Sequence, residues 1–172
     1  MSTQQIRSAI EGAISYLTEH ADEARYTDSV AVATLQEGGL RCTVTGPSGE
    51  TVATDMPPSV GGGGTAPSPG WLFRAAAASC TATLIGMRAA QLGIELTQLE
   101  VSVDSESDDR GLLGMADDVP AGPLSLRVRV NLAAPGADSA TLRELAAWGE
   151  THCPVCDAAG RDVPITLEVE TG

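Results

Sequence analysis

The sequence has few aromatic and few basic residues. Aromatic side chains make up 3% of its 172 residues, whereas hydrophobic residues together reach 42%. We therefore expect a single domain with a core of aliphatic side chains and alanine. Ten basic residues stand against 23 acidic ones, which gives a formal net charge of −13. Because this charge repels nucleic-acid phosphates and anionic lipids, composition argues against nucleic acid and membrane surfaces as partners.

Long apolar segments are also missing. No run reaches the ~18 apolar residues that indicate a membrane-spanning helix. Residues 1–20 are amphipathic and carry acidic side chains, unlike a signal peptide. We therefore expect a soluble cytoplasmic protein. In that compartment the four cysteines are expected to be reduced thiols, catalytic thiols or metal ligands rather than structural disulfides.

One stretch, residues 67–93 (PSPGWLFRAAAASCTATLIGMRAAQLG), has the pattern of a long helix. Ser68 suits the N-cap and Pro69 the first helical position, and Gly93 is placed to end the helix. Between them an alanine run lies near the middle, and no glutamate or lysine marks an exposed face. The pattern predicts a central helix that is buried on every side. Cys80 lies within it, either as a small core residue or as a protected reactive thiol.

The remaining helices and strands cluster rather than alternate. An apolar stripe at helical spacing predicts an N-terminal helix that runs to about Ala24 and packs against its own domain or a partner subunit. A second helix is expected to begin at Asp138 or Ser139. Strands are predicted at residues 29–35, 40–45, 50–55, 99–103, 124–132 and 165–169. This order predicts an α+β fold with a mainly antiparallel sheet.

A loop with two prolines and four successive glycines, residues 56–66, precedes the long helix. A phosphate cradle is one hypothesis for it. The loop lacks the GK[ST] ending and the preceding parallel strand that a phosphate-binding loop has. A flexible loop that lets the long helix enter the core accounts for the same composition.

Three motifs together resemble the OsmC/Ohr family: the long helix segment, the DDRG loop at residues 108–111 and the CPV motif at residues 153–155. The resemblance covers about Ser29 to Glu170. It implies a single OsmC-like domain over residues 1–172, with residues 1–26 as an N-terminal helical extension on a core of residues 27–172. It also implies an intertwined homodimer, in which strongly curved sheets wrap a pair of long central helices and the active sites lie at the subunit interface.

By this resemblance the protein is expected to be a thiol-dependent peroxidase that reduces organic hydroperoxides in defence against oxidative stress. Cys80 matches the peroxidatic cysteine, Cys153 matches the resolving cysteine, and Arg41 is the nearest match to the family's arginine. Reduction back to the thiols would need an external dithiol, and we expect no cofactor and no metal. The family's active-site glutamate lies about three helical turns before the first cysteine, where this sequence has Gly70 and Trp71.

The thiol chemistry can also be argued from the residues. Attack on a peroxide O–O bond needs a thiolate, and a free cysteine with a pKa of about 8.5 is mostly protonated at neutral pH. Cys80 lies too deep in its helix to gain much from the helix dipole, so a cation from elsewhere, Arg41 or Arg110, would have to lower its pKa. The resulting sulfenic acid would condense with a nearby thiol. Cys153 is the natural partner if the fold brings the two cysteines together, because Pro154 frees that segment from helical geometry.

Other interpretations stay open. Cys156 turns the CPV motif into a CPVC pair that could exchange with Cys153 during turnover, although CPVC is expected to end a helix and not to open one as a thioredoxin-like motif does. With His152 these thiols could hold zinc, if Cys42 or Cys80 completed the ligands. A third hypothesis is a diverged member without peroxidase activity that binds a small hydrophobic molecule in an apolar cavity at the dimer interface. The missing glutamate favours it.

Overall fold

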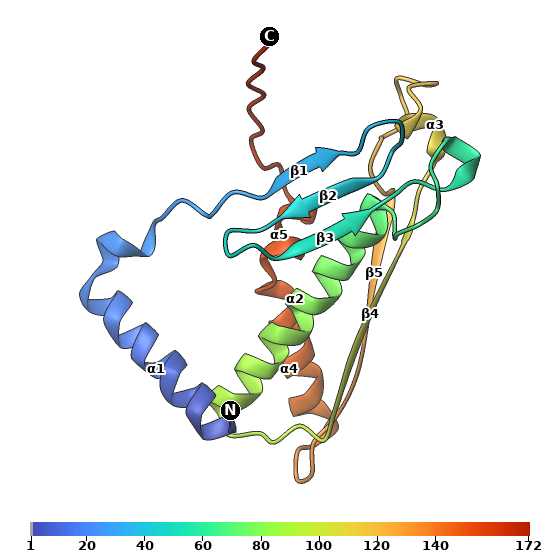
Figure 1. The fold of residues 1–172 in the computed structure, drawn as a ribbon. Coiled ribbons are helices and arrows are strands. Elements are labelled where there is room, and N and C mark those ends of the chain that lie inside the picture. The colour runs from blue at the N-terminus through green and yellow to red at the C-terminus, as the bar shows by residue number, and fades with distance from the viewer. Residues whose placement is uncertain (1) are drawn as a thin grey trace. The chain divides into compact units, whose positions relative to one another are not determined.

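The computed structural model describes residues 2–172, which form an α+β fold with antiparallel sheets, as predicted (Figure 1). The chain divides into two compact units, each built from segments that are distant in the sequence. The first unit contains residues 2–7, 77–102 and 128–172, and the second contains residues 8–76 and 103–127. Helix α2 (Pro69–Leu92) and strands β4 (Gln98–Glu106) and β5 (Ser125–Ala133) each contribute residues to both units.

Three short strands of the second unit form the predicted antiparallel meander. Strands β1 (Val32–Leu35), β2 (Cys42–Thr45) and β3 (Thr51–Thr54) pair in the order β1-β2-β3. The turns between them contain Gly38 and Gly49, whose φ angles of 76° and 88° lie in the left-handed region that favours glycine. Each strand is shorter than its apolar alternation predicts.

Strands β4 and β5 form a separate two-stranded sheet. The Thr97 N–H donates to the Ala133 carbonyl at 2.8 Å, and the Leu124 N–H donates to the Glu106 carbonyl at 2.8 Å, so the two strands run antiparallel. The acidic segment between them contains a short helix, α3 (Asp109–Leu112), where the sequence indicated only a loop.

Helix α2 begins and ends where the sequence predicts. Pro69 is its first residue, and the Ser68 hydroxyl accepts the Trp71 N–H at 3.2 Å. At the other end Gly93 has a φ angle of 70°. Carbonyls of the last turn accept the N–H groups of Gly93 and Ile94, which is the pattern of a Schellman motif.

The prediction that α2 is buried on every side is wrong for the described chain. Its buried side chains form one stripe, most of them four residues apart: Ala77, Thr81, Ile85, Ala89 and Ala90. Other faces remain open, since Trp71 is 49% exposed and Met87 is 37% exposed. An apolar helix is covered all round only where enough other apolar surface surrounds it, and within residues 2–172 that surface reaches one face.

The core of the first unit forms where α4 (Ser139–Thr151) meets α2. Ile85 is 0% exposed and Leu145 is 2% exposed. Gly149 lets the two helices approach closely, because a Cβ atom there would lie 2.3 Å from Cγ1 of Ile85. Partly buried side chains of the two long strands complete the cluster: Leu99, Val101, Val130 and Leu132. The Asp138 side chain caps α4. Asp138 was one of the two residues at which the sequence predicted this helix to begin.

The chain's two ends bury little apolar surface. Helix α1 (Thr3–Glu19) and the 3₁₀ helix η1 (Ala21–Ala24) follow the predicted N-terminal helix, but none of their residues is buried. The predicted last strand is not found, because residues 161–172 contain no helix or strand and Ile165 is 93% exposed. A strand needs a neighbour that accepts and donates its backbone hydrogen bonds, and residues 2–172 place none beside this segment.

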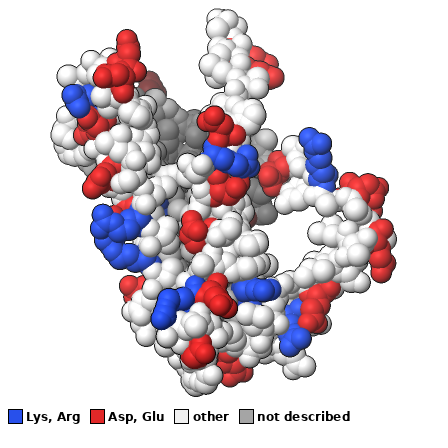
Figure 2. Space-filling model, turned by 180° about the vertical axis from the view of Figure 1, so that it is seen from behind, with Lys and Arg blue, Asp and Glu red and all other residues white. Residues whose placement is uncertain are grey.

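No helix among residues 2–172 combines the length and the apolar composition that crossing a membrane requires. On the face that Figure 2 shows, basic side chains lie among acidic ones and do not gather into a stripe.

Candidate functional site

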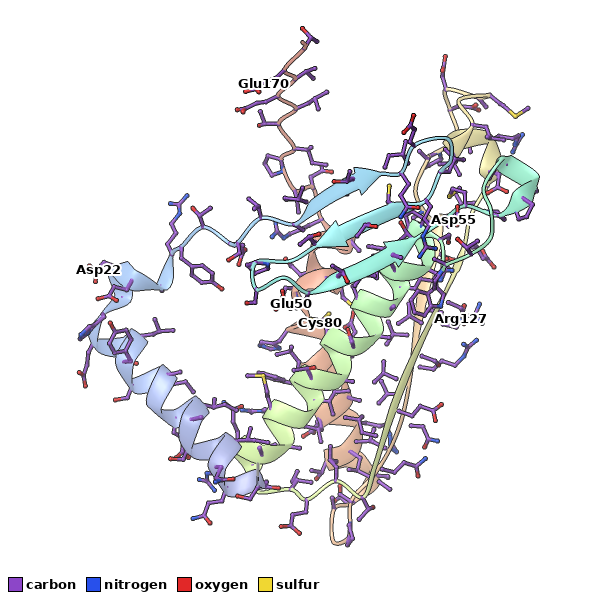
Figure 3. The ribbon with its side chains drawn as sticks, in the orientation of Figure 1. Asp22, Glu50, Asp55, Cys80, Arg127 and Glu170 are labelled. Atoms are coloured by element: carbon purple, nitrogen blue, oxygen red, sulfur yellow. The ribbon has the colours of Figure 1, made fainter. Side chains whose placement is uncertain are left out.

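Two of the three predicted site residues meet between α2 and α5 (Pro154–Gly160), within the first unit. Cys80 lies near the middle of α2 and is partly exposed (Figure 3). Cys153 is the N-cap residue of α5 and is 0% exposed. Its Sγ lies 3.9 Å from the carbonyl oxygen of Ala77 on α2, three residues before Cys80, and the Cys80 and Cys153 thiols shift each other's pKa.

A third thiol belongs to the same group. The Cys156 N–H donates to Sγ of Cys153 at 3.4 Å, and Sγ of Cys156 lies 3.6 Å from Oγ1 of Thr81. Thr81 is 0% exposed and directly follows Cys80 in α2. Cys80, Cys153 and Cys156 are called the thiol cluster below.

The expectation that CPVC ends a helix is wrong. Helix α4 ends at Thr151, Cys153 caps a new helix, and Pro154 is the first residue of that helix, α5. Proline has no N–H to leave unpaired at the first helical position, and its fixed φ angle suits a helix start. Cys153 and Cys156 consequently occupy the N-cap and N3 positions of one helix.

Hydrogen bonding gives the three sulfurs different pKa values. Burial acts to raise the pKa of Cys153, but hydrogen bonds from Thr81, Cys156 and Cys80 outweigh it and lower that pKa below its ordinary value. Burial and the hydrogen bond to Cys153 raise the pKa of Cys80, against a lowering by the Val155 N–H. Burial, with a further contribution from Cys153, raises the pKa of Cys156 to about 11. The first negative charge of the reduced cluster therefore resides on Cys153.

His152 is held by Trp148. The two rings stack with centroids 4.0 Å apart, and Nδ1 of His152 lies 2.8 Å from the Trp148 carbonyl oxygen. Cζ of Arg88 lies 5.0 Å from the centroid of the same indole. In the part of the chain that the structure describes, no three His, Cys, Asp or Glu side chains are placed to hold a metal ion, so nothing in the structure favours the zinc hypothesis.

Arg41, the third predicted site residue, belongs to the second unit. Its guanidinium donates to Oγ1 of Thr65 at 2.7 Å, and that hydroxyl donates to Oδ2 of Asp55 at 2.8 Å. Asp55 is 2% exposed and also accepts N–H groups of the glycine-rich loop. These hydrogen bonds, led by the Thr65 N–H, lower the pKa of Asp55. The loop that was expected to be flexible is thus held by one carboxylate, to which Arg41 is linked through Thr65.

Arg110, the other cation considered, is paired within its own loop. Its Nε donates to Oδ1 of Asp108 at 2.9 Å. This interaction raises the pKa of Arg110 and lowers the pKa of Asp108, so its charge is already balanced by a neighbour.

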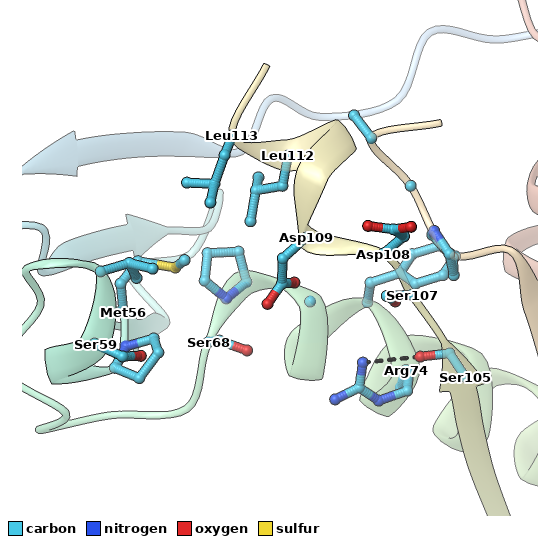
Figure 4. A pocket seen from close by; sticks show the side chains of 18 residues that line it. Met56, Ser59, Ser68, Arg74, Ser105, Ser107, Asp108, Asp109, Leu112 and Leu113 are labelled. Atoms are coloured by element: carbon cyan, nitrogen blue, oxygen red, sulfur yellow. Dashed lines mark hydrogen bonds between the residues drawn. The ribbon is translucent and has the colours of Figure 1, made fainter. Parts of the chain in front are cut away.

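The second unit also holds a cavity of about 510 Å³ at the N-terminus of α2 (Figure 4). Arg74 on α2 donates to Ser105 at 3.2 Å at one side, and the Asp109 side chain points inward from α3. Gly70 lies in the wall, where an added Cβ would have no neighbour closer than 3.9 Å. The apolar lining includes Met56, Val60, Phe73, Leu112 and Leu113.

Sequence reasoning missed Thr81, Thr65 and Asp55. Asp55 carried a usable signal, because it directly precedes a glycine-rich loop and aspartate side chains commonly accept N–H groups of the residues that follow. Thr81 carried none, since its hydroxyl gains a role only when α5 is placed against α2.

Together, the fold and the thiol cluster define an antiparallel α+β protein in which a long helix presents one thiol to a second thiol at the start of a later helix. The sequence profile of the OsmC-like protein family matches residues 61–168. The chain belongs to the OsmC-like family.

Solved structures share this fold. An OsmC-like protein from Mycoplasma pneumoniae has a TM-score of 0.66 at 14% identity, covering 79% of this chain and 89% of that one. The organic hydroperoxide resistance protein OsmC from Legionella pneumophila has a TM-score of 0.57 at 23% identity, covering 78% and 90%. An organic hydroperoxide resistance protein from Elizabethkingia anophelis has a TM-score of 0.57 at 19% identity, covering 78% and 89%. No curated protein sequence gives a significant match.

Proposed function

We propose that the protein is a thiol peroxidase that reduces organic hydroperoxides with two cysteines. The observation that carries this proposal is that Cys153, from a distant part of the sequence, lies against α2 beside Cys80, with its Sγ 3.9 Å from the Ala77 carbonyl oxygen. Family membership and the organic hydroperoxide resistance proteins that share the fold support the same substrate class.

Exposure assigns the roles within the pair. Cys80 is partly exposed, whereas Cys153 is fully buried, so a bulky hydroperoxide reaches only the sulfur of Cys80. Cys153 holds the first negative charge and accepts the proton of the Cys80 thiol as Cys80 becomes the nucleophile. This proton transfer within the pair compensates for the raised pKa of Cys80.

The reaction balances without a metal or organic cofactor. The Cys80 thiolate attacks one oxygen of the hydroperoxide, the O–O bond breaks, and the alcohol leaves after taking up a proton. That proton is the one that Cys153 accepted, so Cys153 is a thiolate again. It attacks the sulfenic acid on Cys80, hydroxide leaves as water with a proton from solvent, and a Cys80–Cys153 disulfide forms. An external dithiol returns both sulfurs to thiols, as the cytoplasm would allow.

Arg41 is the cation that we assign to the peroxide. The hydrogen bond from Arg41 to Thr65, and from Thr65 to the buried carboxylate of Asp55, fixes the direction of the guanidinium. In this proposal Asp55, acting through Thr65, takes the place of the family's glutamate, whose neighbourhood the resemblance matches to Gly70 and Trp71.

The proposal includes an intertwined homodimer. The exposed face of α2, the stripe of α1 and the unpaired C-terminal segment are apolar surfaces that a second copy would cover. Analytical ultracentrifugation at micromolar concentration is expected to give a dimer, and a monomer would contradict this part of the proposal.

Stopped-flow consumption of cumene hydroperoxide by the pre-reduced protein, with a dithiol present, tests the function. Cys80→Ser is expected to abolish fast consumption. Cys153→Ser is expected to slow even the first equivalent, because it loses the group that accepts the Cys80 proton, and to form no Cys80–Cys153 disulfide. Cys42→Ser is the matched control, because Cys42 lies on β2 in the other unit, and it should behave as wild type. Consumption by the wild type no faster than by a free thiol would refute the proposal.

One observation favours a second candidate, a binding protein for a small hydrophobic molecule. The cavity at the start of α2 has an apolar wall, and Gly70 leaves room where the family's glutamate would stand. Gly70→Trp would fill part of that space. If binding of a hydrophobic fluorescent probe is lost in Gly70→Trp and the wild type consumes no peroxide, this second function is the better one.

A further inference from the structure

The two-cysteine mechanism leaves Cys156 unused, although its thiol lies in the same cluster. We propose that Cys156 accepts the disulfide from Cys80, so that the oxidised protein rests with a Cys153–Cys156 disulfide and a free Cys80. This inference rests on the proposed function for the source of oxidation, but the exchange itself involves only the three sulfurs.

Helix geometry brings the two sulfurs of the CPVC segment together. Cys153 is the N-cap residue of α5, and the N–H of Cys156 at position N3 donates to its Sγ at 3.4 Å. N-cap and N3 side chains face each other, as the reciprocal hydrogen bonds of a capping box show. A rotation of the Cys156 side chain away from Thr81, which it contacts at 3.6 Å, turns its Sγ toward Cys153.

The exchange balances within the cluster. The Cys156 thiol gives its proton to solvent, and the resulting thiolate attacks Sγ of Cys153. The bond between Cys80 and Cys153 breaks, Cys80 leaves as a thiolate, and a bond between Cys153 and Cys156 forms. No oxidant or reductant is consumed, because one disulfide replaces another. The Val155 N–H, which acts to lower the pKa of Cys80, favours the leaving thiolate.

The order of events follows from which sulfur carries charge. In the reduced cluster, burial comes first among the causes that raise the pKa of Cys156, and the hydrogen bond and negative charge of Cys153 and the charge of Glu150 add to it. Once Cys153 is part of a disulfide its charge is gone, and the contribution of Cys153 to that raised pKa disappears. Cys156 is therefore a protonated thiol that takes no part before oxidation. After oxidation its pKa falls and it becomes a better nucleophile.

The different exposure of Cys153 and Cys156 determines where a reductant can attack the new disulfide. Cys153 is fully buried, whereas Cys156 is partly exposed. An external dithiol therefore meets the Cys153–Cys156 disulfide at Cys156. Cys80, the sulfur that hydroperoxide reaches, is freed before the reductant arrives.

Disulfide mapping of the full-length protein tests the inference. The reduced protein is oxidised with one equivalent of cumene hydroperoxide or, separately, with diamide, quenched in acid, alkylated with iodoacetamide and mapped by mass spectrometry. The wild type is expected to show Cys153–Cys156 and alkylated Cys80 with either oxidant. Cys156→Ser is expected to show Cys80–Cys153 and to lose alkylation at Cys80, while Cys42 is alkylated in both proteins.

The two oxidants separate this inference from the proposed function. Diamide giving Cys80–Cys153 first and then Cys153–Cys156, while hydroperoxide is not consumed, would refute the peroxidase and support the exchange. A wild type that retains Cys80–Cys153 with both oxidants would overturn the exchange and leave the peroxidase standing. If Cys156→Ser does not fold, a time course in the wild type decides the matter, because Cys80–Cys153 must appear first and then give way to Cys153–Cys156.

Discussion

Replacing Gly149 with alanine is expected to push α4 away from α2. The added Cβ would lie 2.3 Å from Cγ1 of Ile85 and 3.0 Å from its backbone nitrogen. Ordinary contact begins near 3.4 Å, and Ile85 is 0% exposed, so its side chain has little room to retreat. Overpacking of a core costs typically 1–3 kcal/mol, and contact with backbone places this case toward the upper end. Alanine regains about 1 kcal/mol through helix propensity, which leaves a net loss of about 2 kcal/mol.

Urea unfolding followed by circular dichroism measures this loss. Gly12→Ala is the matched control, because it makes the same change inside helix α1, where a Cβ would meet nothing within 4 Å. Gly12→Ala should gain up to about 1 kcal/mol, so the two variants should move the unfolding midpoint in opposite directions. The same displacement should slow disulfide formation between Cys80 and Cys153, because α4 leads directly into Cys153.

Unfolding of Gly149→Ala at the wild-type urea concentration or above it would refute the predicted loss of stability. That result would mean that α4 does not lie against Ile85 as closely as the structure has it. A stable Gly149→Ala with slow disulfide formation would contradict the stability argument alone.

Three further predictions concern single side chains. Thr81→Val keeps the shape but removes the hydroxyl that lowers the pKa of Cys153. The first ionisation of the thiol cluster, followed by the ultraviolet absorbance of the thiolate, should therefore move to higher pH in Thr81→Val than in Thr81→Ser, and an unchanged titration would contradict the assigned hydrogen bond. The lowered pKa of Asp55 contributes stability that is present above its unfolded pKa of about 4 and is lost as pH falls through the folded pKa. Below pH 4 the urea midpoint should therefore decline less in Asp55→Asn than in the wild type. Parallel declines in the two proteins would contradict the stabilising role of the Asp55 carboxylate. Gly93→Ala should destabilise by roughly 1–2 kcal/mol in the same urea assay, because its φ angle of 70° is left-handed, and an unchanged midpoint would argue against the helix end described.

Local signals made much of the fold predictable. Pro69 and Gly93 bounded α2 correctly, because caps and terminators act through their immediate neighbours. Asp138 marked the start of α4 for the same reason. The three-stranded meander followed from alternation broken by glycine turns.

The failures share a different physical cause, since each depended on what lies beside a segment. Residues 165–169 alternate like a strand, but a strand forms only against another strand. The apolar composition of α2 predicted full burial, whereas the described chain covers one stripe of it. Pro154 was correctly expected to break a helix, but its second effect, the start of α5, was missed.

The candidate site could likewise be predicted where local sequence signals sufficed and could not where it depended on contacts between distant segments. Cys80 and Cys153 could be proposed from motif spacing and family resemblance. Their proximity could not be derived from the sequence, because it depends on α5 lying against α2. The places of Cys156 and Thr81 depend on the same contact.

The central claim is that Cys80 and Cys153 form the redox pair that consumes organic hydroperoxide. Single-turnover stopped-flow with cumene hydroperoxide, comparing the wild type with Cys80→Ser and with Cys42→Ser, tests it most directly. The account predicts rapid loss of one equivalent of peroxide in the wild type and in Cys42→Ser, and none in Cys80→Ser. Equal and slow loss in all three proteins would contradict it.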